Sequence, residues 1–118
     1  MTTEVTKPKI LIIEDSRETS LVMTRLLEAE YEIAVTERGE VGLSLTKSFQ
    51  PDLVLLDIGL PDIDGYEVCE KIKDDPDTKN ISVVFITSKD DSLGEGKGLR
   101  LGAIDYIIKP FSYFTFRA

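Results

Sequence analysis

The chain has 118 residues, 42% of them hydrophobic, which is enough to build the core of one domain of ordinary size. Its 22 acidic and 14 basic residues give a net charge of −8, so we expect no direct binding to nucleic acid, which needs a basic face. One cysteine and no histidine exclude an internal disulfide and any histidine-based proton or phosphoryl chemistry from the chain's own residues.

The chain also lacks the sequence marks of a membrane or secreted protein. No apolar stretch approaches the roughly 18 residues of a spanning helix, and the polar start Met1-Thr2-Thr3-Glu4 does not resemble a signal peptide. A single cysteine is typical of a reducing compartment. We therefore expect a cytoplasmic protein that makes no contact with a membrane.

In chain order, a polar tail over residues 1–8 precedes a single domain that we expect to occupy residues 9–118. Short apolar runs bounded by turn residues predict strands that are buried on both faces of a parallel sheet. We expect these strands at about residues 9–14, 31–36, 53–57, 81–87 and 106–108.

Between the strands, apolar residues recur three or four positions apart, which predicts helices. We expect helices at about residues 17–30, 41–49, 66–74 and 92–101. Ser16 precedes the first of them and is a candidate N-cap. Strands that alternate with helices imply right-handed crossovers and helices on both faces of the sheet. The expected fold class is therefore α/β, a doubly wound parallel sheet of five strands.

Polar residues follow the buried strands at one edge of this sheet. Glu14 and Asp15 follow the first strand, Asp57 closes the third, Thr87 ends the fourth, and Lys109 follows the fifth. In parallel sheets the binding crevice lies outside the carboxyl ends of the strands. Three acids, a hydroxyl group and a lysine therefore converge on one candidate site.

Together these positions resemble the receiver domain of two-component response regulators, over residues 9–111. The segment Pro61-Asp62-Ile63-Asp64-Gly65 is similar to the proline-to-glycine loop that follows the acceptor aspartate in that family. Each motif alone is a weak signal, but five motifs in order, each at its own strand end, are specific. The resemblance implies the flavodoxin-like strand order 2-1-3-4-5.

The resemblance also implies that Asp57 takes a phosphoryl group from a phosphohistidine on a partner, either a histidine kinase or a histidine phosphotransfer protein. Asp15 and Asp57 would repel each other and the donor unless a cation lay among them, and hard carboxylate oxygens suit Mg²⁺. By the same resemblance, Mg²⁺ or Mn²⁺ is bound by Asp15, Asp57 and the backbone carbonyl of Gly59, while Glu14 acts through a metal-bound water.

Two further residues complete the implied site. Thr87 donates its hydroxyl group to one phosphoryl oxygen, and Lys109 pairs with another as a point charge. Thr87 also moves toward the phosphoryl group after modification, and Tyr106 then fills the vacated space, which switches the output face. The peptide bond between Lys109 and Pro110 is expected to be cis. On this interpretation the chain is not an enzyme beyond accepting and slowly losing its own phosphoryl group, and its output is a further domain or a downstream protein.

Other residues carry simpler expectations. We expect Cys69 to be a small buried filler, and Asp62 and Asp64 to be solvated turn residues with no part in the metal site. Residues 112–118 are too few for the full amphipathic helix with which the family ends, so this last helix is expected to be short or missing. Its aromatic residues could instead cover the sheet or pair with a second molecule in a homodimer.

Three alternative functions are weighed against the phosphoacceptor. A pseudo-receiver would only bind partners, and the intact set of acids, hydroxyl and lysine argues against it. A haloacid-dehalogenase-type phosphatase also uses an aspartate after a buried strand, but Gly59 stands where that family has its second aspartate. A flavodoxin-like flavin binder is disfavoured because residues 15–19 are too acidic to hold a flavin phosphate.

Overall fold

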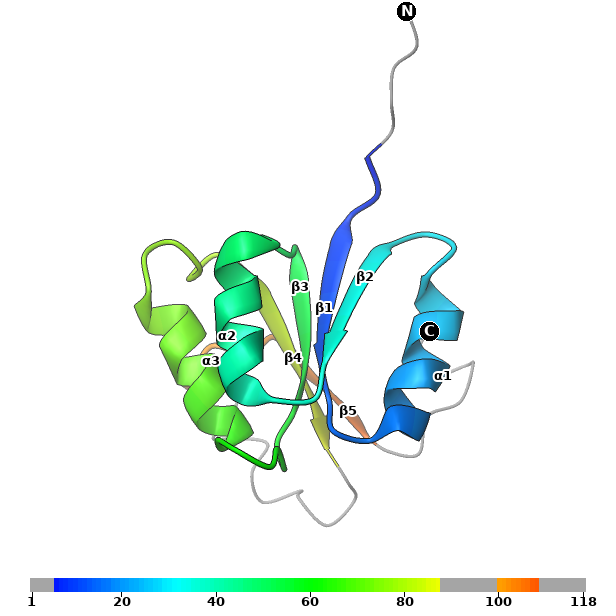
Figure 1. Ribbon diagram of the computed structural model, residues 1–118. Coiled ribbons are helices and arrows are strands. Elements are labelled where there is room, and N and C mark those ends of the chain that lie inside the picture. Colours follow the sequence, from blue (N-terminus) through cyan, green and yellow to red (C-terminus); the bar gives the residue numbers. More distant parts are fainter. Residues whose placement is uncertain (1–5, 88–99, 109–118) are drawn as a thin grey trace, which may run out of the picture.

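The computed structural model describes residues 6–87 and 100–108, and for Thr87, Asp105, Tyr106 and Ile108 it describes the backbone alone. Five strands and three helices lie within these ranges (Figure 1). In chain order they are β1 (Lys9–Ile13), α1 (Arg17–Leu27), β2 (Glu32–Thr36), α2 (Gly39–Ser48), β3 (Leu53–Asp57), α3 (Gly65–Asp74), β4 (Ser82–Thr87) and β5 (Asp105–Ile108).

The strands form one sheet in the order β2-β1-β3-β4-β5, and every neighbouring pair is parallel. This confirms the expected fold class and strand order. The register places Ile13, the last residue of β1, opposite Leu56, and it places Asp57, the last residue of β3, opposite Ile86. The carboxyl ends of the central strands therefore lie at the same edge of the sheet.

Helices cover both faces of the sheet, with α2 and α3 on one side and α1 on the other (Figure 1). Alternate strand residues supply the two cores because successive side chains point to opposite faces. Leu11 and Leu56 pack with the side of α2 and α3, whereas Ile12 and Leu55 pack with Met23 of α1. Each fully buried side chain of this size contributes about 1.5–3 kcal/mol. The apolar runs are thus buried on both faces, as expected.

Helix α1 begins where the sequence predicts and ends earlier. The side chain of Ser16 accepts a hydrogen bond from the amide of Thr19 at 3.2 Å, which confirms Ser16 as the N-cap. The helix ends at Leu27, three residues before the expected end at Glu30. The amides of Glu30 and Tyr31 both donate to the carbonyl of Leu27, at 3.1 and 3.0 Å, so the chain turns there toward β2.

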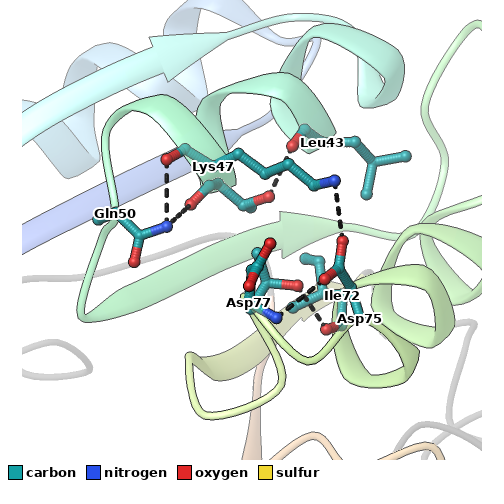
Figure 2. Close-up of polar contacts among 8 residues, drawn as sticks. Leu43, Lys47, Gln50, Ile72, Asp75 and Asp77 are labelled. Carbon is teal, nitrogen blue, oxygen red and sulfur yellow. Dashed lines mark hydrogen bonds and ion pairs between the residues drawn. The ribbon is translucent and has the colours of Figure 1, made fainter.

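The last turns of α2 and α3 are joined at the amino ends of the strands, away from the candidate site (Figure 2). Lys47 Nζ lies 3.0 Å from Asp75 Oδ2, and Asp75 Oδ1 accepts a hydrogen bond from the amide of Asp77 at 2.9 Å. Gln50, whose φ is +50°, donates its side-chain amide to the carbonyls of Thr46 and Lys47. The two bonds from Gln50 satisfy carbonyls that the end of α2 leaves without an intrahelical partner.

Several expectations fall outside the described residues. These are most of the helix at 92–101, the bond between Lys109 and Pro110, and the last helix at 112–118. The turn before the fifth strand is described, and Gly102 has a φ of +103°, which glycine adopts readily. Among the described residues, no helix is long and apolar enough to cross a membrane.

Candidate functional site

Adjacent strands bring the three predicted acids together. Glu14 and Asp15 directly follow β1, and Asp57 closes β3, the strand paired with β1. Each of the three side chains offers a carboxylate oxygen, and these oxygens all lie within 4.8 Å of one another. We call Glu14, Asp15 and Asp57 the acidic triad. The expectation that they converge at the carboxyl edge of the sheet is confirmed.

The triad differs in burial from one member to the next. Glu14 is 0% exposed and Asp57 is 6% exposed, whereas Asp15 is exposed. Glu14 is held in place because its Oε2 accepts a hydrogen bond from the amide of Ser16 at 3.1 Å and its own amide donates to the carbonyl of Thr36 at 3.0 Å. Two buried carboxylates beside an exposed one carry a high desolvation cost unless a cation compensates their charge.

The donor set fits a hard divalent cation. All three side chains offer carboxylate oxygens, which Mg²⁺ and Mn²⁺ prefer, and the exposed Asp15 leaves one side of the triad open to water or a substrate oxygen. The triad therefore has the chemistry of a divalent-cation site with room for an incoming anion.

Short contacts fix the backbone around Asp57. Its Oδ1 accepts a hydrogen bond from the amide of Gly59 at 3.2 Å, and the amide of Gly65 donates to the carbonyl of Ile58 at 3.0 Å. A Cβ atom on Gly65 would lie 2.3 Å from the carbonyl oxygen of Asp57, so α3 can start this close to β3 because residue 65 is glycine. A Cβ on Gly59 would meet no atom of residues 6–87 or 100–108 within 4 Å.

The other predicted site residues are described less fully. Thr87 ends β4 opposite Ile108 of β5, and Tyr106 lies opposite Phe85, so both backbones belong to neighbouring strands at this side of the sheet. The side chains of Thr87 and Tyr106 and the whole of Lys109 lie outside the described residues. Their assigned roles therefore stay predictions.

The expectation for Asp62 and Asp64 needs correction. Both side chains are exposed, as expected, but neither is merely solvated. Asp64 is the N-cap of α3 and accepts a hydrogen bond from the amide of Tyr66 at 2.9 Å. Asp62 accepts hydrogen bonds from the first amides of α2, those of Gly39 at 2.9 Å and Glu40 at 3.0 Å. The spacing Asp64-x-x-Glu67 was a capping signal in the sequence, whereas the Asp62 contact spans more than 20 residues and left none.

Cys69 is the buried filler that the sequence predicts. It is 0% exposed on the inner face of α3, and its Sγ lies 3.8 Å from the carbonyl oxygen of Leu101. Burial raises the pKa of the thiol to about 11. At neutral pH Cys69 is therefore protonated and inert.

An open groove of about 400 Å³ at the carboxyl end of β2 was not predicted from the sequence. It lies between α1 and β2 and includes Arg17, Val35 and Arg38 in its lining. A second hollow continues along α1 past Leu21, which is 53% exposed. Arg17 is close to the triad in the chain, two positions after Asp15, so the groove opens at the same edge of the sheet.

An all-parallel sheet in the order 2-1-3-4-5, with an acidic triad at the ends of β1 and β3, defines an α/β domain whose carboxylate cluster could hold a metal ion beside one buried aspartate. A family model described as the response regulator receiver domain matches residues 10–117. The chain therefore belongs to the family of response regulator receiver domains.

Individual proteins agree with the family match. The chain is 42% identical over 103 residues to the probable cyclic di-GMP phosphodiesterase of Vibrio cholerae serotype O1, a match that covers 87% of this chain and 23% of the relative. It is similar to the crystal structure of a response regulator from Chloroflexus aurantiacus J-10-fl, with a TM-score of 0.88, 30% identity and coverage of 95% and 94% of the two chains. The Mn(2+)-bound form of the response regulator Rcp1 gives a TM-score of 0.81 and 27% identity, with coverage of 93% and 87%.

The chain spans less than half the length of the curated relatives it matches, between 8% and 47%. Receiver domains act in two-component signalling as phosphoacceptors, and where such relatives are enzymes the activity belongs to other parts of their longer chains. This chain is thus a receiver domain of the two-component signalling family.

Proposed function

We propose that this domain accepts a phosphoryl group on Asp57 from a phosphohistidine of a histidine kinase or a histidine phosphotransfer protein. The observation that carries the proposal is the acidic triad, which places a nearly buried aspartate within 4.8 Å of two further carboxylates at the open edge of the sheet. Residues 9–118 would form the phosphoacceptor module, and the output would come from a further domain or a downstream protein.

The proposed reaction is a direct transfer between side chains. A carboxylate oxygen of Asp57 attacks the phosphorus, a new O–P bond forms, and the P–N bond to the donor imidazole breaks. The imidazole keeps the electron pair of that bond and takes up a proton. Because both reactants are anionic, the approach needs positive charge near the attacking oxygen, and the chain's own candidate for this charge is Lys109.

A divalent cation would share that task. Its proposed ligands are Asp15, Asp57 and the backbone carbonyl of Gly59, with Glu14 acting through a bound water. When bound, Mg²⁺ or Mn²⁺ would neutralise the carboxylates and bind a phosphoryl oxygen. The Mn(2+)-bound structure of Rcp1, a similar chain, supports a cation of this kind.

The switch is proposed to involve Thr87 and Tyr106. Thr87 would turn its hydroxyl group toward the phosphoryl oxygens, and Tyr106 would enter the space that Thr87 leaves. The register of β4 and β5, in which Thr87 faces Ile108 and Phe85 faces Tyr106, puts the two residues on neighbouring strands and so supports the pairing. The phosphoryl group can shift this equilibrium by its difference in affinity for the two states.

The groove between α1 and β2 is the proposed docking surface for the phosphohistidine protein. It combines exposed apolar side chains, Leu21 at 53% and Val35 at 44% exposure, with the guanidinium group of Arg38 and with that of Arg17, whose Nε lies 3.6 Å from Glu37 Oε1 in the same lining. An amphipathic helix with apolar residues flanked by acids would complement this surface. Because such donors draw their phosphoryl groups from ATP, the proposal agrees with the cytoplasmic location that the sequence predicts.

Incubation with acetyl phosphate and Mg²⁺, followed by intact-mass measurement, tests the central step. We expect a gain of one phosphoryl group in the natural chain and none in Asp57→Asn. Asp52→Asn is the matched control, because Asp52 lies at the opposite end of β3 and bonds the amide of Lys9. An adduct of equal amount in Asp57→Asn would contradict the proposal, and no adduct in any variant would favour the pseudo-receiver.

A second measurement separates this function from that of a phosphatase. A phosphoacceptor takes up one phosphoryl group per chain and stops, whereas a phosphatase continues to release phosphate from added substrate. Sustained phosphate release at many turnovers per minute, lost in Asp57→Asn, would favour the aspartate-nucleophile phosphatase.

A further inference from the structure

Helix α2 receives its N-terminal cap from the loop that follows Asp57. The helix's own N-cap residue, Arg38, makes no side-chain capping hydrogen bond. Instead, the two carboxylate oxygens of Asp62 each accept one hydrogen bond, Oδ1 from the amide of Gly39 at 2.9 Å and Oδ2 from the amide of Glu40 at 3.0 Å. Because Asp62 comes five positions after Asp57, this cap ties the phosphoacceptor loop to α2.

Apolar packing reinforces the same attachment. Ile63, the next residue, is 9% exposed and lies against the first turn of α2. A Cβ atom on Gly39 would lie 2.2 Å from Ile63 Cγ2 and 3.3 Å from Leu60 Cδ1. The side chains of the loop therefore pack directly against the backbone of α2 at residue 39. The amide of Glu40, and after it that of Gly39, holds the pKa of Asp62 below its usual range, as expected for a carboxylate that accepts backbone hydrogen bonds.

The segment between Asp57 and this attachment contains the proposed carbonyl ligand. At its start, the amide of Gly59 donates to Asp57 Oδ1 at 3.2 Å. Among the described residues, a Cβ on Gly59 would meet nothing within 4 Å. The contacts of its neighbours therefore set the position of residue 59. On one side these are the hydrogen bonds of Asp57 and Ile58, and on the other they are the packing of Leu60 against the start of α2 and the cap made by Asp62.

We propose that Asp62 is a positioning residue for the metal site. By anchoring the loop to α2, it holds the backbone carbonyl of Gly59 in place relative to the carboxylates of Asp15 and Asp57. We do not assign Asp62 as a ligand, because the carboxylates that gather within 4.8 Å are those of Glu14, Asp15 and Asp57, and the oxygens of Asp62 face the amides of α2. The inference rests on the proposed function, in which Gly59 contributes a ligand.

Mn²⁺ affinity, measured without any phosphoryl donor, tests this role. We expect Asp62→Ala to weaken Mn²⁺ binding on the order of tenfold, the effect typical of residues that orient ligands from outside the first coordination shell. Asp62→Asn keeps one acceptor oxygen for the α2 amides and is expected to lose less. The concentration of free Mn²⁺ can be measured from its electron paramagnetic resonance signal at a temperature where every variant is folded.

Two control variants separate positioning from charge and from stability. Asp64→Asn removes a negative charge from the same loop but keeps an acceptor for the amide of Tyr66, so it reports the effect of charge alone. Asp52→Ala removes a carboxylate that accepts a hydrogen bond from the amide of Lys9 at 2.8 Å, far from the triad, so it reports the effect of a lost backbone contact. We expect both to bind Mn²⁺ within about twofold of the natural chain, well short of the order-of-magnitude losses typical of second-shell changes.

The outcomes are distinguishable. Unchanged Mn²⁺ affinity in Asp62→Ala, or an equal loss in Asp64→Asn, would overturn the positioning role while the proposed function stands. Should Asp62→Ala not fold, the comparison of Asp62→Asn with Asp64→Asn decides, and equal affinities overturn the inference. If the natural chain binds no Mn²⁺, or binds it equally well as Asp15→Asn, the proposed metal site fails and the inference fails with it.

Discussion

At the scale of single residues, burial decides the chemistry of Cys69. The thiol is 0% exposed within α3, and this burial raises its pKa from 9.0 to about 11. The thiolate is the reactive form of cysteine, so a buried thiol with a raised pKa is a poor nucleophile. Cys69 can thus fill the core without becoming a site of alkylation or oxidation.

We therefore predict that Cys69 resists a thiol reagent at pH 8 in the folded protein and reacts once per chain in urea. Raising the pH should also lower stability relative to Cys69→Ala. Between about pH 9 and 11 the unfolded chain loses the thiol proton and the folded chain keeps it, so the free energy of unfolding falls across this window. Urea melts of both proteins at several pH values measure the difference, and an identical pH dependence would contradict the prediction.

Individual residues also show where sequence reasoning ends. Ser16 and the triad could be assigned from the sequence because their partners are close in the chain or follow from parallel strand ends. The capping role of Asp62 could not, since its partners in α2 lie 22 and 23 residues away and become neighbours through the fold alone. A turn aspartate looks the same in sequence whether water or a distant helix binds its oxygens.

At the scale of elements, the start of α2 depends on a glycine. Sequence periodicity predicted this helix from about residue 41, whereas it begins at Gly39. The loop residue Ile63 occupies the place where a side chain of residue 39 would stand, 2.2 Å from the position of a Cβ. The approach of the β3–α3 loop therefore sets this boundary, and apolar spacing could not reveal it.

We predict that Gly39→Ala destabilises the protein by about 1–3 kcal/mol, because Ile63 must move out of a packed position. The double variant Gly39→Ala, Ile63→Ala should be less destabilised than the sum of the two single changes, since the second change frees the space that the first needs. Gly59→Ala is the matched control, because nothing in the described part of the chain lies within 4 Å of its Cβ position and its stability should stay near that of the natural chain. Urea unfolding without divalent cations measures all four, and strict additivity would argue against the contact.

The ion pair between Lys47 of α2 and Asp75 at the end of α3 leads to a second prediction at this scale. The pKa of Asp75 lies below its ordinary value, first because of the amide of Asp77 and second because of Lys47 (Figure 2). A lowered pKa stabilises the fold above the ordinary aspartate pKa, and this contribution is lost as the pH falls below it. In Lys47→Ala we expect the pKa of Asp75 to rise yet stay below its ordinary value, as a carboxyl-detected NMR titration can show. A return to the ordinary value would mean that the ammonium, and not the amide, dominates.

At the scale of the whole molecule, the sequence pattern predicted the fold class, and the family resemblance supplied the strand order. Apolar runs such as Leu53–Leu56, which alternate with helices, are typical of a parallel sheet with helices on both sides. That topology brings the ends of β1 and β3 to one edge, so the acidic triad follows from the fold. The groove between α1 and β2 did not follow, because its shape depends on which side chains α1 leaves uncovered beside an edge strand.

The same architecture predicts that Mg²⁺ stabilises the whole domain. The folded state gathers three carboxylates within 4.8 Å and the unfolded chain does not, so a cation bound by them favours folding. At a concentration one hundred times its dissociation constant, Mg²⁺ should add about 2.7 kcal/mol to the free energy of unfolding.

We expect Asp15→Asn to lose most of this gain and, without cations, to be at least as stable as the natural chain, because it relieves repulsion within the triad. Asp52→Asn should keep the full gain. Thermal melts over a Mg²⁺ series measure the shift, and an equal rise in the melting temperature of all three proteins would show that Mg²⁺ acts by general screening of the −8 charge instead of at the triad.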